Sequence, residues 1–168
     1  MAYDGQFSIA DDFINHLDGV MIGIADPFLQ SRYLGFVVLS AVTVFELAIK
    51  DVFIEFAEKK HVVLGNVIRS KFEQINGRIR ISSLQNEFIK PFGAKYLERF
   101  NKNLENAEVE SLRSRNGSIK SSYGNIIQWR HDFVHQARAP QTTNYVEVKA
   151  AYHRAKGVIH CLDKTMKR

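Results

Sequence analysis

One long series of apolar residues at helical spacing limits the possible folds of this 168-residue chain more than any other feature. Asp26 followed by Pro27 is typical of a helix start, with the proline in the first turn. The pattern therefore predicts a helix over about residues 27–60, roughly 50 Å long at 1.5 Å per residue. A helix of this length is expected to be the central element of the fold. From residue 34 to 56 the apolar side chains recur every three or four positions, as on one helix face: Leu34, Val37, Val38, Ala41, Val44, Phe45, Ala48, Ile49, Val52, Phe53 and Phe56.

Helical periodicity also marks the segments around this one. Apolar residues from Phe13 to Ile24 predict a first helix, with Ser8 and Asp11 as its capping box. A third helix is expected from Leu64 to Ile75, ending near Gly77 in a left-handed cap.

The second half of the chain continues the helical pattern. Residues 83–113 predict a helix that is kinked or broken near Pro91 and Gly93, followed by a turn at 115–118. Two more helices are expected over about 121–138 and after a capping box at Asn144. Because no segment alternates with period two over a useful length, the prediction is an all-α bundle of five to six helices, forming one domain over residues 1–168.

Composition narrows the class of protein. The single cysteine, Cys161, excludes a disulfide framework and a cysteine-based zinc finger, and every apolar run is too short to cross a bilayer. The N-terminal residues are acidic where a signal peptide would be basic, so we expect a cytoplasmic protein without a membrane segment. Residues 111–168 carry 11 basic and 3 acidic side chains, a net charge of +8. This excess is either an ordinary solvated surface or a binding surface for a polyanion.

Arg130 interrupts an otherwise apolar helix face. Within 121–138 that face consists of Tyr123, Ile126, Ile127, Phe133, Val134 and Ala137, and Arg130 falls in the middle of the series. An unpaired guanidinium group in a core is strongly unfavourable. Arg130 must therefore pair with an anion, for which Glu46 on the long helix is the candidate, or lie where this face opens onto an interface or a cleft.

Two histidines follow directly. His131 and His135 are four residues apart and share a helix face. Arg130 and His135 lie about 140° apart at roughly 100° per residue. They converge on one phosphate only if a side chain wraps around, the helix unwinds, or a second subunit completes the site. We favour a second copy related by a two-fold axis.

Three chemistries fit these residues. The histidines resemble a zinc pair, but Asp132 is shorter than the usual glutamate and no third ligand is evident. Alternatively, a histidine removes the proton of a ribose 2′-hydroxyl while an arginine neutralises the charge that develops on the phosphate, which cleaves RNA without a metal. In the third interpretation the histidines only satisfy hydrogen bonds at the surface.

Three nearby residues are candidates for RNA binding. Trp129 has a ring that can stack on a base, although partial burial at a helix contact is the commoner role of such a residue. Lys120 and Arg138 are candidates for contacting the phosphate backbone, or are ordinary solvated charges.

The spacing Arg130-HDFV-His135 resembles the Arg-x(4–6)-His motif of the HEPN superfamily, small helical bundles that include many metal-independent endoribonucleases. The long helix with Glu46, the segment YGNIIQWRHDFVHQA and the last helix look like the RiboL-PSP and MAE-type branches. His131 stands where asparagine is common in that family.

The resemblance implies a homodimer that cuts single-stranded RNA to a 2′,3′-cyclic phosphate and a 5′-hydroxyl without a cofactor or metal. His135 would be the general base or acid, Arg130 the phosphate clamp and His131 an orienting group, with Glu46 and Asp132 in support. It also implies a toxin or antiphage setting with a possible antitoxin partner. The alternative is an inactive HEPN scaffold that binds RNA, a nucleotide or a partner protein.

Overall fold

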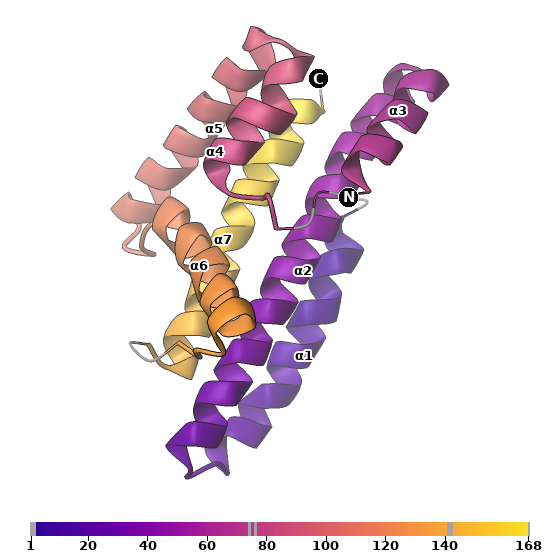
Figure 1. Ribbon diagram of the computed structural model, residues 1–168. Coiled ribbons are helices and arrows are strands. Elements are labelled where there is room, and N and C mark those ends of the chain that lie inside the picture. Colours follow the sequence, from indigo (N-terminus) through magenta and orange to yellow (C-terminus); the bar gives the residue numbers. More distant parts are fainter. Residues whose placement is uncertain (1–2, 74, 76, 141–142, 168) are drawn as a thin grey trace.

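The computed structural model describes residues 3–73, 75, 77–140 and 143–167, and within them every regular element is helical (Figure 1). The α-helices are α1 Asp4–Ile22, α2 Pro27–Lys60, α3 Val62–Phe72, α4 Ile81–Ser83, α5 Ala94–Arg113, α6 Ile119–Gln136 and α7 Tyr145–Met166. A π-helix, η1 Leu84–Ile89, and a 3₁₀ turn, η2 Lys90–Phe92, connect α4 to α5. The all-α fold class is confirmed, but the described residues form seven α-helices rather than five or six, because short α4 is an element of its own.

The predicted long helix is confirmed as α2, which spans 34 residues. The Asp26 side chain accepts a hydrogen bond from the Phe28 amide at 2.9 Å, as expected of an N-cap, and the helix continues to Lys60. Residues along its whole inner face are buried, from Leu34 to Ala57. This helix therefore provides the surface on which α1, α3, α6 and α7 pack.

The first helix starts earlier than predicted. It begins at Asp4, and Ser8 lies inside it, where its hydroxyl donates to the Gly5 carbonyl. The capping box predicted at Ser8 and Asp11 is therefore wrong. Phe7 explains the earlier start, because it is buried and packs edge to face against Phe45 of α2 at 6.2 Å between ring centroids.

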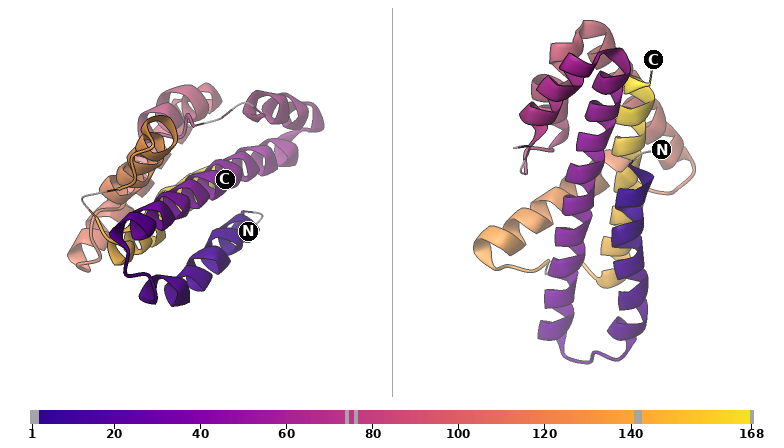
Figure 2. Two further views of the ribbon diagram at one scale, coloured as in Figure 1. Left: turned by 60° about the horizontal axis from the view of Figure 1, so that its bottom comes forward. Right: turned by 90° about the vertical axis from the view of Figure 1, so that its right-hand side faces the viewer.

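The centre of the core lies between α2, α6 and α7. The Phe45 ring stacks between those of Tyr123 on α6 and Tyr152 on α7, at 5.5 and 5.8 Å. All three side chains are fully buried. In the right-hand view of Figure 2, α1, α2 and α7 run side by side, and the C-terminal end of α6 projects away from them.

The third helix ends before the predicted position. It stops at Phe72, and Ile75 is buried in the connection that follows. Gly77 does have a left-handed backbone, with φ of 75°, but it lies in this connection and not at the end of α3. Its amide donates to Glu46 Oε1 at 2.8 Å, which attaches the connection to the middle of α2.

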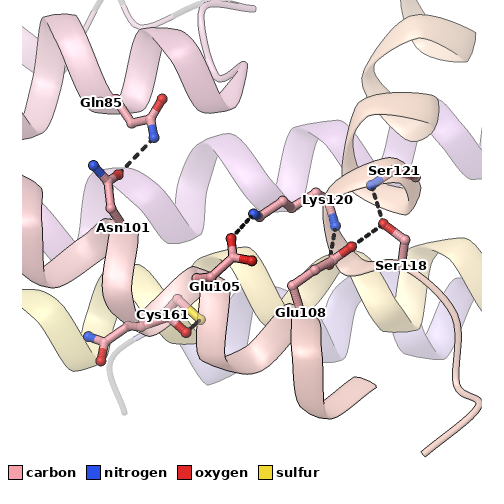
Figure 3. A network of polar contacts seen from close by, with 9 residues as sticks. Gln85, Asn101, Glu105, Glu108, Ser118, Lys120, Ser121 and Cys161 are labelled. Carbon is pink, nitrogen blue, oxygen red and sulfur yellow. Dashed lines mark hydrogen bonds and ion pairs between the residues drawn. The ribbon is translucent and has the colours of Figure 1, made fainter. Parts of the chain in front are cut away.

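The predicted interruption near Pro91 and Gly93 is confirmed, since α5 starts only at Ala94. The turn at 115–118 is also confirmed, and it leads into α6 at Ser118, whose hydroxyl accepts from the Ser121 amide. Glu108 of α5 accepts hydrogen bonds from the Ser118 hydroxyl at 2.5 Å and the Lys120 amide at 3.0 Å (Figure 3). This network fixes the start of α6 against α5.

The last helix begins as predicted. The Asn144 side chain accepts from the Glu147 amide, and the Glu147 carboxylate accepts from the Asn144 amide, which completes the capping box. Among the described helices, none is long and apolar enough to cross a bilayer.

Candidate active site

The C-terminal half of α6 is held against the first half of α2 by one close approach. A Cβ atom on Gly35 would lie only 2.1 Å from the Phe133 ring, so only glycine leaves room for this ring. Phe133 also meets Phe36 edge to face at 5.7 Å. Beyond them, Ala137 ends α6 in a left-handed conformation, and its carbonyl accepts from Arg32 at 3.2 Å. These contacts set the position of residues 130–136.

The predicted apolar face of α6 is only partly buried. Tyr123, Ile126 and Ile127 are buried and Phe133 is half-buried, as expected for a core face. Val134 is 46% exposed and Ala137 is also exposed, which corrects their assignment to the core. The physical reason is that the end of α6 projects beyond the α2 and α7 layer (Figure 2).

Arg130 is partly buried, and its candidate partner Glu46 makes a different contact. Its Nε atom is buried without a hydrogen bond, and Glu46 accepts from Gly77 instead. Arg130 Nη1 lies 3.8 Å from the position that a Cβ on Gly77 would occupy, so the guanidinium group lies beside Gly77 in the connection between α3 and α4. No ion pair joins Arg130 to Glu46 within the described residues. A buried guanidinium nitrogen without a partner is rare in folded proteins.

The two histidines form a pair on the exposed side of α6. The centroids of the His131 and His135 rings are 4.7 Å apart, with 48° between the ring planes, and both residues are exposed. Asp132 lies between them in sequence, and its Oδ1 accepts from Gln128 Nε2 at 2.8 Å. The Asp132 backbone carbonyl accepts from the amides of Ala137 and Arg138. Asp132 thus stabilises the end of the helix that carries the pair.

Arg130 and the histidine pair occupy different faces of α6. Within the described residues no hydrogen bond or ion pair connects Arg130 to His131 or His135. Arg130 faces the 73–80 connection, while the histidine rings face solvent. The site in one chain thus consists of an unpaired guanidinium and a separate imidazole pair.

A metal centre would need further ligands. In the part of the chain that the structure describes, no three histidine, cysteine, aspartate or glutamate side chains are grouped so that they could hold a metal ion. His131 and His135 therefore lack a third protein ligand there.

The other sequence candidates lie in varied environments. Trp129 is partly buried and packs against the core, and Arg138 is exposed just beyond α6. The Lys120 ammonium group pairs with Glu105 at 2.5 Å (Figure 3). Lys156 pairs with Asp11, so part of the basic C-terminal third is neutralised within the fold.

Sequence reasoning missed the contribution of the connection between α3 and α4. Gly77 and Arg80 lie far from α6 in sequence, yet a Cβ on Gly77 would lie 3.8 Å from Arg130 Nη1, and Arg80 donates weakly to Gln128 Oε1 at 3.5 Å. The segment Gly77-Arg78-Ile79-Arg80 does combine a glycine with two arginines. That local signal gave no indication of which helix the connection would meet.

A comparison with protein families agrees with the resemblance carried by the Arg-x4-His spacing. The model of the family described as RiboL-PSP-HEPN matches residues 7–168. No curated protein matches the chain. No solved structure matches it either.

Proposed function

The chain belongs to the RiboL-PSP-HEPN family, and from this membership and the residues on α6 we propose that it is a metal-independent endoribonuclease of single-stranded RNA. HEPN domains are often ribonucleases, so the family itself supports an RNA-related enzyme. One observation carries the finer proposal: Arg130, with a buried Nε that has no partner, lies on the same helix segment as an exposed histidine pair.

The proposed reaction needs one base, one acid and one cation. The ribose 2′-oxygen attacks the adjacent phosphorus while a histidine removes the 2′-hydroxyl proton. The bond from phosphorus to the 5′-oxygen breaks, and that oxygen takes up a proton from a second group. The products are a 2′,3′-cyclic phosphate and a 5′-hydroxyl. His135 is the proposed base or acid, His131 orients it or supplies the second proton transfer, and Arg130 stabilises the extra negative charge on the phosphate.

The proposed site is shared between two copies of the chain. In one copy Arg130 and the histidines face different sides of α6, so a second copy is the simplest way to bring both groups to one phosphate. Exposed apolar side chains at this end of the molecule support such an interface. Phe28, Leu29, Phe36 and Val134 are between 46% and 60% exposed. Light scattering at micromolar concentration is expected to give twice the 19.3 kDa chain mass.

The proposed biological setting follows from the family resemblance. A ribonuclease of this kind fits a toxin of a toxin–antitoxin system or an antiphage defence protein. A cognate antitoxin protein is then the partner expected to cover the site until RNA cleavage is required.

The test is RNA cleavage by the purified protein in excess EDTA. End-labelled single-stranded RNA is incubated with wild type, with His135→Ala and with Arg130→Ala. His16→Ala, at an exposed histidine on α1, and Arg113→Ala, at an exposed arginine on α5, are the matched controls. Wild type and both controls are expected to cleave, and the two α6 variants to lose at least a hundredfold in rate.

Two results would contradict this proposal. Cleavage that is abolished by EDTA and restored by zinc would replace the metal-free reaction. Intact RNA with correctly folded wild type would favour the scaffold alternative, in which the same surface binds RNA or a protein without cutting.

A further inference from the structure

A separate cavity of about 290 Å³ lies beside α6, before the histidine pair. One wall consists of residues 80–82 of the connection into α4, and the other consists of Tyr123, Gly124, Ile127 and Gln128 of α6. None of the residues assigned to the proposed reaction lines it. Its volume lies just below the ~300–1,000 Å³ range of small-ligand sites, which suits a single planar ring system.

Gly124 is the unexpected residue of this cavity. Glycine is among the least favourable residues in a helix interior. Gly124 lies in α6 with ordinary backbone angles, and a Cβ built there meets no atom within 4 Å. Neither backbone conformation nor close packing therefore explains this glycine. Because Gly124 lines the cavity, a side chain at this position would begin in open space at the cavity wall.

The cavity and the histidine pair share one side of α6. At about 100° per residue, Gly124, Gln128, His131 and His135 fall within about 60° around the helix axis. Gly124 and His131 are about 10 Å apart along the axis, at 1.5 Å per residue. A single-stranded RNA with one phosphate at the histidines would thus place a neighbouring nucleotide beside the cavity.

The chemistry of the walls suits a nucleobase. Ile81 is partly exposed and Ile127 is 7% exposed, and these two lining residues provide an apolar surface for the face of a ring. Arg80 is exposed at the rim, and within the described residues its side chain makes one hydrogen bond, the weak one to Gln128. Its guanidinium group has further donors for ring nitrogen and carbonyl acceptors. The Gln128 amide is oriented by its donation to Asp132, which leaves its carbonyl facing Arg80.

We propose that this cavity binds a base of the single-stranded RNA substrate, one or two nucleotides from the phosphate that is cut. Ile81 and Ile127 contact the ring, Arg80 donates to its edge, and Gly124 keeps the entrance open. This assignment rests on the proposed ribonuclease function and adds a positioning subsite to it.

The test fills the cavity without unfolding the helix. Gly124→Leu places a side chain at the open mouth, and the matched control Gly19→Leu changes another exposed helical glycine with nothing within 4 Å, on α1. Both are made in a His135→Ala background, and binding of a fluorescent 12-nucleotide RNA is measured by anisotropy. Gly124→Leu is expected to raise the Kd at least tenfold with an equal or higher melting temperature. Gly19→Leu is expected to change it less than twofold.

A second pair of variants tests whether the loss of Arg80 weakens RNA binding more than the loss of another exposed positive charge does. Arg80→Ala is expected to raise the Kd about fivefold, more than Arg113→Ala, which removes the same charge from an exposed position on α5. The inference is overturned if Gly124→Leu and Arg80→Ala bind RNA as their controls do, or if wild type binds no RNA. If wild type binds RNA but does not cut it, only the ribonuclease proposal is contradicted. The Kd values of the variants and their controls then still decide whether the cavity binds a base.

Discussion

The contact between Gly35 and Phe133 gives a prediction whose size follows from the structure. In Gly35→Ala the new methyl group would lie 2.1–2.4 Å from three atoms of the Phe133 ring, far below an ordinary contact, so the ring or α6 must move. Overpacking of this kind costs about 1–3 kcal/mol. Replacing a helical glycine by alanine raises the unfolding free energy by up to about 1 kcal/mol through helix propensity. The net loss of unfolding free energy is therefore about 1–2 kcal/mol, or roughly 2–8 °C in melting temperature for a chain of this length.

Urea denaturation followed by circular dichroism measures this effect in a double-mutant cycle. In a Phe133→Ala background the clash is gone, so Gly35→Ala becomes neutral or stabilising by up to about 1 kcal/mol. The coupling energy between the two positions is then about 1–3 kcal/mol. RNA cleavage should also fall in Gly35→Ala, because Phe133 lies between the two histidines on α6. Equal effects of Gly35→Ala in both backgrounds would refute the reasoning.

Three further predictions address the acid response, a helix cap and the shared site. Burial disfavours the charged form of Glu108, but hydrogen bonds from Ser118 and from backbone amides hold its pKa below the ordinary 4.5. The ionised Glu108 carboxylate therefore stabilises the folded state above pH 4.5, and this stabilisation is lost as the pH falls through the lowered pKa of Glu108 in the folded protein. Urea titrations at a series of pH values should show that the unfolding free energy of Glu108→Gln falls less with acid than that of wild type. Asn144→Ala removes the cap of α7 and should cost about 1 kcal/mol of unfolding free energy, and an unchanged urea midpoint would contradict this. Mixing inactive Arg130→Ala and His135→Ala chains should restore about a quarter of wild-type cleavage through mixed dimers, whereas a site within one chain predicts no recovery.

The helix ends that were predicted correctly are those determined by residues close to them in the sequence. Asp26 and Pro27 start α2, and the Asn144 capping box starts α7, because the side chains that form these caps lie within a few residues of the helix ends. The start of α1 and the end of α3 depend on distant contacts. Phe7 packs on Phe45, and Gly77 is held by Glu46, which no periodicity along the chain reveals.

In the candidate site, too, local features could be predicted from the sequence and distant contacts could not. The placement of Arg130 in an apolar series and the pairing of the two histidines follow from helical geometry alone. Of the two alternatives for Arg130, the ion pair with Glu46 is not formed within the described residues, where the Glu46 carboxylate accepts from the backbone amide of Gly77. Arg80 reaches α6 only through the path of the 73–80 connection, which tertiary packing determines.

The central claim is that this chain cuts RNA by attack of a 2′-hydroxyl group, and one measurement tests it most directly. Once a cleavage position is mapped, the same oligonucleotide is made with a single 2′-deoxy nucleotide on the 5′ side of that position and incubated with wild type in excess EDTA. Cleavage is expected to disappear at this position only, and the unmodified RNA is expected to give 2′,3′-cyclic phosphate ends. Continued cleavage next to the deoxy nucleotide, or products with 5′-phosphate ends, would contradict it.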